Sequence, residues 1–328
     1  MKKSVSRGLA ACLSGLLSIL ARLPAPLGRA VVSLGAFAYV RLARGTRQTI
    51  TTNLRHIQEG LAQQGVAIDS IDAFAERNLR ATAQLVPETA VCWRGPPDAW
   101  RSLIEEVHGD EALALLTRAY EQPNSNARVL LLSPHLGNWE LLNMYLGAEF
   151  GLTVLYDPPK LAALEPLIRK ARERTRSTVL PIGPAGLRSM VQRLRQGHVV
   201  GLLPDQVPRH ESGVLASFFG KQALTINLVH RLASRHSPRV FLVCALRKAN
   251  GRFDIHFDEL TQTLAGVSEA ESAAALNSAI EHRVAQAPEQ YQWSYKRFKR
   301  VSANTPNIYR LTERDNQSAA VSAAKKLE

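Results

Sequence analysis

The sequence predicts an α/β protein: a central, mostly parallel sheet flanked by helices, with an N-terminal membrane-associated helical segment ahead of it. Short apolar runs rich in β-branched residues alternate with helical segments through the middle of the chain. The apolar fraction of 45% over 328 residues allows a sizeable core. Two apolar runs stand before the first regular helical pattern. We therefore expect one domain with appendages at both ends.

The first of these appendages is residues 1–43, which open on a basic stretch followed by apolar runs at 8–21 and 30–40. At about 1.5 Å per residue, neither run alone crosses a hydrocarbon core of roughly 30 Å. We expect this segment to anchor the chain to a membrane without a clean span. A cleaved secretory signal peptide is the alternative, but no small-x-small cleavage site follows the apolar run.

The α/β domain is expected over residues 44–301, and it begins with a largely helical stretch at 44–116. Within that stretch, residues 73–91 carry apolar side chains three and four apart, which is typical of a helix. The strands predicted next are 127–133, 152–156, 178–182, 199–203, 240–246 and 252–257, and the helices are 161–176, 185–196, 224–234 and 268–287. Residues 302–328 lose periodicity and are expected to form a mobile tail.

Charge and cysteine content limit the surroundings of the protein. Its 41 basic and 28 acidic residues give a net charge of +13, which favours phospholipid headgroups, phosphorylated glycolipids, nucleic acid or acidic proteins as partners. Charge alone does not choose among them. Cys12, Cys92 and Cys244 lie far apart in apolar runs, without the paired spacing of zinc ligands or a disulfide framework. A reducing location without a bound metal fits best.

The segment richest in chemistry is Ser-Pro-His-Leu-Gly-Asn-Trp-Glu at 133–140, which lies between a predicted strand and an apolar helix. Ligands of open α/β sheets bind beyond the carboxyl ends of the strands, and helix amino termini offer free N–H donors. A five-residue offset places His135 and Glu140 on different faces of an ideal helix. His135 is therefore expected in the preceding loop, folded back toward Glu140.

Such a pair suits acyl transfer. An imidazole can accept a hydroxyl proton while a carboxylate fixes its tautomer and stabilises the imidazolium, so no enzyme nucleophile is required. Alternatively, His135 is a loop histidine bonded to the backbone, and Glu140 is a carboxylate that the helix dipole favours in a first turn. The residues alone leave both interpretations open.

The His135-x4-Glu140 motif resembles that of the late acyltransferases of lipid A biosynthesis, within the lysophospholipid acyltransferase superfamily. The resemblance extends from residue 30 to 299 and includes, in the family's order, segments 156–160 (YDPPK), 194–197 (LRQG), 203–206 (LPDQ), 218–221 (FFGK) and 293–299 (WSYKRFK). One His-x4-Glu is a weak pattern, whereas an ordered series of this kind is specific.

The resemblance implies an O-acyltransferase at the bacterial inner membrane, with its active site facing the cytoplasm. It would move a fatty acyl group from an acyl carrier protein thioester to a hydroxyl of a lipid A precursor, without cofactor, metal or nucleic acid. His135 would be the general base and Glu140 its partner. Arg174 would contact the anionic substrate, and Asp205 corresponds to a characteristic aspartate of the family. Relatives often have Tyr-Arg-Pro where this chain has Tyr-Asp157-Pro, so one positive charge of the family pattern is missing here.

Further substrate contacts are predicted at Asn138, Lys160, Phe218, Phe219 and Gly220. The basic stretch 161–176, which contains Arg174, could instead be a solvated helix face, and Asp205 could cap a turn. Phe218, Phe219 and Gly220 could be core aromatics followed by a turn rather than an apolar wall for a fatty chain. The aromatic and basic residues of 293–300 could meet single-stranded nucleic acid or, as the apolar amino terminus favours, a membrane interface.

Other classes of function fit less well. No Gly-x-Ser-x-Gly elbow, His-Glu-x-x-His helix or phosphate-binding glycine loop is present in the sequence. A non-catalytic basic protein that binds membranes would explain the charge but not His135 and Glu140. Transfer to a lysophospholipid or another glycolipid remains an alternative.

Overall fold

The structure is a computed structural model. It describes residues 2–24, 27–28, 30–32, 35, 39, 42–121, 128–159, 161–264, 266–300 and 307–310. At 2–7, 9 and 210 it describes the backbone only. Lys160 and nearly all of the tail predicted at 302–328 lie outside the described residues. Much of the second apolar run, 30–40, does too.

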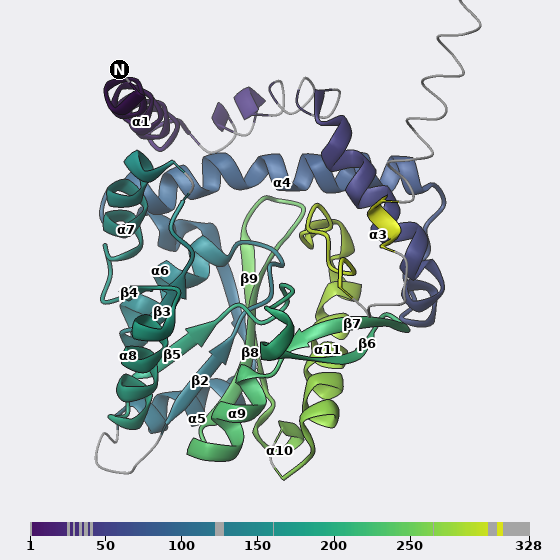
Figure 1. Cartoon of the computed structure of the whole chain (residues 1–328). Coiled ribbons are helices and arrows are strands. Elements are labelled where there is room, and N and C mark those ends of the chain that lie inside the picture. Colours follow the sequence, from purple (N-terminus) through teal and green to yellow (C-terminus); the bar gives the residue numbers. More distant parts are fainter. Residues whose placement is uncertain are drawn as a thin grey trace, which may run out of the picture.

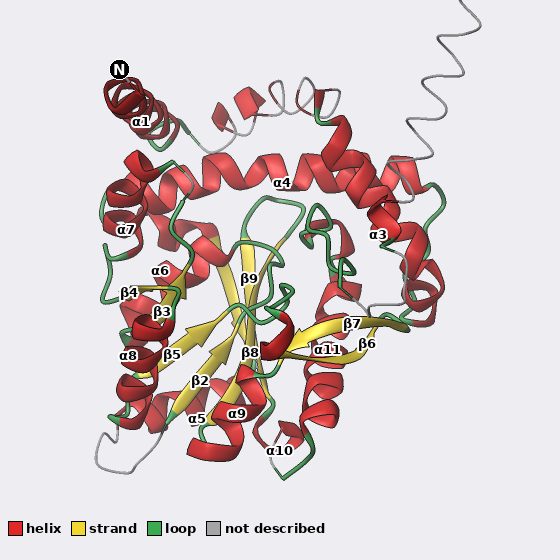
Figure 2. Ribbon diagram, viewed as in Figure 1, coloured by secondary structure: helices red, strands yellow, loops and turns green. Residues whose placement is uncertain are grey.

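A seven-stranded sheet forms the centre of the molecule, in the order β1-β9-β8-β2-β5-β3-β4 (Figure 2). Every neighbouring pair is parallel except β8 and β9, which confirms the mostly parallel sheet. The strands are β1 (Ile104–His108), β2 (Val129–Leu132), β3 (Thr153–Tyr156), β4 (Thr178–Pro181), β5 (Val199–Leu202), β8 (Arg239–Arg247) and β9 (Phe253–Glu259).

Helices cover both faces of this sheet. The described helices are α1 (Lys2–Leu20), α3 (Arg44–Gln63), α4 (Ile71–Arg94), α5 (Asp110–Glu121), α6 (Trp139–Phe150), α7 (Glu165–Arg172), α8 (Pro184–Arg195), α9 (Leu228–His236), α10 (Thr261–Leu264) and α11 (Glu269–Gln286). Short 3-10 turns lie at Ala99–Leu103, Ala162–Leu164, His210–Ser212 and Pro288–Gln290. The long α4 runs across one end of the sheet, between α7 and α3 (Figure 1).

The strands have a core on each side because their side chains alternate. In β2, Leu130 and Leu132 belong to a cluster with residues of α3, α8, α9 and α11. Val129 and Leu131 point the other way, into a cluster with residues of α5 and α6. A buried parallel strand therefore reads as the unbroken apolar run seen in the sequence.

Two parts of the sequence prediction are wrong. Residues 213–226 form a β-hairpin of β6 (Gly213–Phe218) and β7 (Lys221–Ile226), so the helix predicted at 224–234 begins only at Leu228. The stretch 44–116, predicted as helical, also contains the edge strand β1. These three strands were hidden because charged or small residues interrupt their apolar alternation.

The amino-terminal helix α1 packs beside α4 (Figure 1), where the Arg94 guanidinium donates to the hydroxyl of Ser14. Several apolar side chains of residues 2–42 are exposed, among them Leu16, Ile19, Leu27, Val31 and Leu42. No helix within the described ranges is both long enough and apolar enough to span a membrane.

Candidate active site

The register of two parallel strands brings His135 and Asp205 together. Strands β2 and β5 are neighbours, and Leu132 pairs with Leu202. His135 and Asp205 each follow three residues after their member of that pair. Both side chains therefore emerge at the carboxyl edge of the sheet, where ligands of α/β proteins bind.

The Asp205 carboxylate holds His135 at two points. Its Oδ1 lies 2.8 Å from the imidazole Nδ1, and its Oδ2 accepts the backbone N–H of His135 at 2.8 Å. Asp205 is almost fully buried, and 15% of the His135 side chain is exposed. The ring also packs edge-on against Trp139, with 5.3 Å between centroids. The imidazole is thus fixed in orientation and still reachable from solvent.

Asp205 remains ionised in this environment. Burial by itself would raise the pKa of its carboxyl group. The His135 charge, the two hydrogen bonds from His135 and the nearby Arg297 outweigh burial and bring that pKa below its ordinary value. Tyr291 lies against the same carboxylate, and burial together with the Asp205 charge raises the pKa of its phenol well above the usual value. An anionic Asp205 favours the tautomer in which Nδ1 carries the proton.

The second ring nitrogen of His135 faces Gln206. The Gln206 Nε2 atom lies 3.1 Å from His135 Nε2 and 3.2 Å from the Gln292 side-chain oxygen. With the proton on Nδ1, Nε2 carries a lone pair that accepts from this amide. The same lone pair would take a proton from a substrate hydroxyl. Gln206 therefore occupies the position of an incoming donor.

The loop that carries His135 is clamped from two sides. Gln292 donates its N–H to the His135 carbonyl at 2.9 Å, and Gly137 donates to the Gln290 carbonyl at 3.1 Å. Gly137 has a φ of +64°, and a Cβ there would lie 1.8 Å from the Ala245 carbonyl oxygen. Only glycine fits this position. The loop geometry therefore depends on the Gly137 in the motif.

Glu140 does not pair with His135 as the sequence predicted, because the carboxylate against Nδ1 is that of Asp205. Glu140 instead accepts from Arg172, with Nη2 at 2.5 Å and Nε at 3.2 Å, and from the Trp93 indole N–H at 2.9 Å. The five-residue offset explains the difference, since His135 precedes α6 whereas Glu140 lies in its first turn. Glu140 thus ties α6 to α7 and α4.

Asn138 begins α6 and belongs to a buried polar network. Its side-chain oxygen accepts the Leu141 N–H at 2.9 Å, which caps the helix. Its amide donates to Glu88 at 3.2 Å, and Glu88 binds the Arg247 guanidinium at 2.5 and 2.8 Å. Asn138 is itself 1% exposed. The structure therefore places this predicted substrate contact in the support of the loop.

Arg174 and most other basic residues of 161–176 have hydrogen-bond or ion-pair partners within the chain, while Lys170, Arg174 and Arg176 stay exposed to solvent. Arg174 donates to the Cys92 and Gly95 carbonyls at 3.0 and 2.7 Å, at the carboxyl end of α4. Arg169 pairs with Glu165, and Arg176 donates to the Ala148 and Glu149 carbonyls.

The aromatic pair Phe218–Phe219 and Gly220 form the turn between β6 and β7. Both rings are at most 1% exposed, and Phe218 lies against Phe219, Tyr291 and Phe298. Gly220 has a φ of +74°, which suits a turn glycine. The packing favours core aromatics and a turn over the predicted wall of a fatty-chain site.

The membrane or nucleic acid contact predicted for residues 293–300 is wrong for its central side chains. Trp293 and Phe298 are each 1% exposed, and Arg297 is 2% exposed. Arg297 donates to the Leu224 carbonyl at 2.7 Å and to the Thr225 hydroxyl at 2.9 Å. The alternation of aromatic and basic residues looked like a surface motif, but Trp293, Arg297 and Phe298 are interior side chains. Lys296 and Lys299 are partly buried, and Arg300 is exposed.

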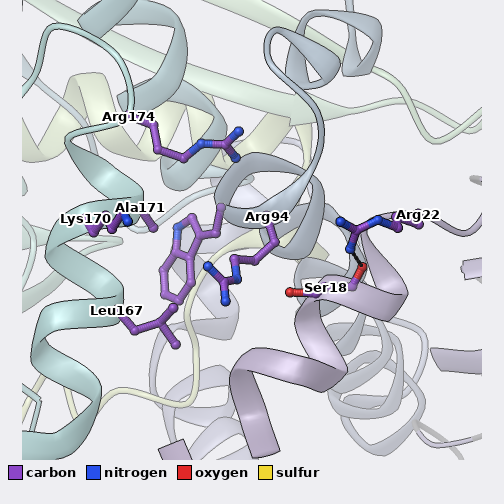
Figure 3. Close-up of a pocket in the computed structure, with 8 residues that line it drawn as sticks. Ser18, Arg22, Arg94, Leu167, Lys170, Ala171 and Arg174 are labelled. Carbon is purple, nitrogen blue, oxygen red and sulfur yellow. Dashed lines mark hydrogen bonds between the residues drawn. The ribbon is translucent and has the colours of Figure 1, made fainter. Parts of the chain in front are cut away.

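A basic cavity of about 400 Å³ lies where α1, α4 and α7 meet (Figure 3). It is lined by Ser18, Arg22, Trp93, Arg94, Leu167, Lys170, Ala171 and Arg174. An adjoining depression also includes Lys170 and Arg174. Trp93 links this cavity to Glu140 through its indole N–H. Trp93 and Arg94 were not predicted from the sequence because their roles depend on helices meeting in space, and Arg172 was considered only as part of the basic stretch 161–176.

Comparison with known proteins supports the resemblance seen in the motifs. Residues 5–300 match the family model described as bacterial lipid A biosynthesis acyltransferase. The chain belongs to this family. It is 28% identical over 235 residues to a lipid A biosynthesis palmitoleoyltransferase of Escherichia coli K12, covering 71% of this chain and 73% of that protein.

Two further relatives have related names. A lipid A biosynthesis lauroyltransferase of Escherichia coli K12 is 24% identical over 238 residues, covering 71% of this chain and 74% of that protein. Lipid A biosynthesis acyltransferase 2 of Shigella flexneri is 22% identical over 281 residues and 82% of each chain. Membership of this family indicates that the chain is an acyltransferase.

Proposed function

We propose that the protein transfers a fatty acyl group from an acyl carrier protein thioester to a hydroxyl of a lipid A precursor, with His135 as general base. The observation that carries this proposal is the His135–Asp205 pair at the carboxyl edge of the sheet. Family membership and the names of the relatives support the acceptor.

In the proposed reaction, the acceptor hydroxyl replaces Gln206 at His135 Nε2 and loses its proton to that nitrogen. The hydroxyl oxygen attacks the thioester carbonyl carbon, and the carbonyl becomes an oxyanion. The carbon–sulfur bond then breaks, and the imidazolium returns its proton to the leaving thiolate. Asp205 stabilises the imidazolium between these steps. Because the acceptor oxygen attacks the thioester directly, no acyl-enzyme is formed.

The basic cavity is the proposed binding site for the anionic part of a substrate. Lys170 lines both the cavity and the adjoining depression, and within the described part of the chain it forms no ion pair. Arg22 and Arg94 point toward the same space (Figure 3). Arg174 contributes charge here while it caps α4, so its predicted substrate contact is retained as a proposal. A phosphorylated headgroup would find several cations and few carboxylates.

The exposed apolar side chains of α1 and the following segment are the proposed membrane contact, with the active site on the cytoplasmic side. Leu16 and Ile19 are 52% and 62% exposed on a helix that borders the basic cavity. Replacing both by serine should lower the fraction of protein that sediments with anionic vesicles. If the double serine variant sediments as much as the wild type in high salt, the proposal is contradicted, because screening removes contacts made by charge alone.

The test of function is a reaction of the purified full chain with an acyl carrier protein thioester and a lipid A precursor, read by mass spectrometry. An added acyl mass on the precursor, lost in His135→Ala, is the expected result. Transfer to a lysophospholipid in place of the precursor would show a different acceptor. A covalent acyl-enzyme that proceeds to product would contradict direct transfer.

A further inference from the structure

Four side chains that can bind a metal ion share one face of the sheet edge. Strands β1 and β9 are parallel there, and Glu106 pairs with Asp254 and His108 with His256. Residues two apart on a strand point to the same face, and so do paired residues of neighbouring strands. The four side chains therefore form a two-by-two grid of imidazoles and carboxylates at the end of the sheet away from β4.

The ligand atoms in this grid are close together. His108 Nε2 lies 3.4 Å from an Asp254 oxygen and 3.4 Å from a Glu106 oxygen. The His108 and His256 rings stack with centroids 4.8 Å apart and an angle of 15°. One ligand atom each from His108, Asp254 and His256 lies within 4.8 Å of the others. Zinc bonds of about 2.0–2.2 Å in a tetrahedron place ligand atoms roughly 3.3–3.6 Å apart.

Asp254 supplies a second and independent observation. Its Oδ1 is buried and has no hydrogen-bond partner among the described residues. A buried carboxylate oxygen without a partner is costly, and native structures rarely leave one unsatisfied. Its Oδ2 pairs at 3.3 Å with Lys248, whose side chain is 39% exposed. Lys248 can turn into solvent, so this cation does not block the position.

Nearby charges leave the grid open to a cation. Arg283 of α11 lies near His256, but its guanidinium pairs with Asp258. Lys248 also pairs with Glu105, at 3.3 Å. Of the two carboxylates in the grid, Asp254 faces this movable lysine. Imidazole and carboxylate donors together suit Zn²⁺ and similar ions, whereas Ca²⁺ and Mg²⁺ prefer all-oxygen sites.

We propose that His108, Asp254 and His256 bind a divalent transition-metal ion of the Zn²⁺ class, with Glu106 or water completing the shell. The ion would join edge strand β1 to β9 and so stabilise this edge of the sheet. This site is separate from His135 and Asp205, which follow β2 and β5. The expectation that no metal is bound came from cysteine spacing, and His108 and His256 meet only through the strand register.

The experiment is calorimetric titration of the full-length chain, freed of any affinity tag, with Zn²⁺. We expect one ion per chain, and at least tenfold weaker binding in His108→Ala and in Asp254→Asn. His108 is 41% exposed, so its replacement should leave the fold intact. The matched control is His282→Ala, which removes an exposed histidine on α11 and should bind Zn²⁺ as the wild type does. His135→Ala should also bind normally.

A second readout is the unfolding temperature. Zn²⁺ should raise Tm of the wild type and of His282→Ala, because an ion that binds only the folded chain stabilises it. It should not raise Tm of His108→Ala. Absence of binding, or equal affinity in His108→Ala and the wild type, would overturn the proposal. Neither readout depends on acyl transfer, so failure here and failure of the proposed reaction can be told apart.

Discussion

Two buried carboxylates near the start of α6 have opposite surroundings. Asp205 comes from a neighbouring strand and binds an imidazole that solvent can reach. Glu140 comes from the motif itself and binds the Arg172 guanidinium and the Trp93 indole. An arginine stays charged at any ordinary pH, so Glu140 is committed to a permanent ion pair. Asp205 is the carboxylate that can respond when His135 gains a proton.

The contrast teaches that nearness in sequence and nearness in a sheet select different partners. His135 and Glu140 are five residues apart, but a helix start separates their side chains. His135 and Asp205 are held together by the pairing of Leu132 with Leu202. Substitutions that affect only one of the two carboxylates can therefore test which of them is the partner of His135.

The largest effect is expected for His135→Ala. Loss of a general base commonly costs about 10²- to 10⁴-fold in rate, and turnover should fall by at least that order if chemistry is rate-limiting. The folded state should persist because the ring is near the surface. Initial rates measured by mass spectrometry, beside a thermal unfolding curve, check this. Normal turnover in a folded His135→Ala protein would exclude the general-base role.

Asp205→Asn should come next, with a loss on the order of 10²-fold or more in turnover. The amide keeps the size of the side chain but cannot stabilise the imidazolium as a carboxylate does. The His135→Ala/Asp205→Asn double variant should be little slower than His135→Ala alone, because members of a catalytic unit are not additive. Additive losses would show that Asp205 acts apart from His135.

Glu140→Gln should have a smaller effect on turnover, about tenfold, which corresponds to about 1.4 kcal/mol. Glutamine can still accept from Trp93, but Arg172 loses its charged partner. Stability should fall by about 1–3 kcal/mol, since an unpaired and largely buried cation remains. Measurement of both rate and unfolding free energy separates the two roles. A rate loss equal to that of His135→Ala, without destabilisation, would restore the direct catalytic role predicted from the motif.

Much of this architecture could be predicted from sequence, but the partners at the site could not. The strands β2, β5 and β8 could be predicted because a buried parallel strand needs continuous apolar side chains. His135 could be predicted as a site residue because it follows such a strand. The partner of its Nδ1 could not, since the order of β2 and β5 in the sheet is decided by packing of distant segments. Asp205 was singled out only by resemblance.

The hairpin β6–β7 and the segment 293–300 show the same limit. Composition alone does not decide whether Phe218 and Trp293 lie on a surface or in a core. The choice came from α3 and α11 closing over them, which no local pattern describes. Arg297 was read as an exposed cation because arginine is rarely buried. Its buried position depends on the Leu224 carbonyl and the Thr225 hydroxyl of a hairpin that the sequence reading missed.

Lys170→Ala tests the cavity and should raise KM for the acceptor about three- to tenfold with little change in kcat. A headgroup contact made equally in ground and transition states affects binding rather than turnover. Lys221→Ala is the matched control, because Lys221 is a partly exposed lysine on the hairpin that pairs with Glu59. Equal effects of the two substitutions would mean that overall charge, not the cavity, attracts the acceptor.

The smallest effect is expected in the pH dependence of stability. The pKa of Asp205 is lower in the folded chain than its ordinary value near 3.8, mainly because His135 and its hydrogen bonds outweigh burial. A lowered folded pKa contributes stability that is fully present above the unfolded pKa and is lost as pH falls through the folded value. The free-energy difference between wild type and Asp205→Asn should therefore shrink as pH falls below about pH 4. Denaturant unfolding at a fixed detergent concentration across this range gives the difference directly. A difference that grows as pH falls below about pH 4 would mean that the folded protein holds Asp205 protonated, and the proposed stabilisation of imidazolium would then lack its anion.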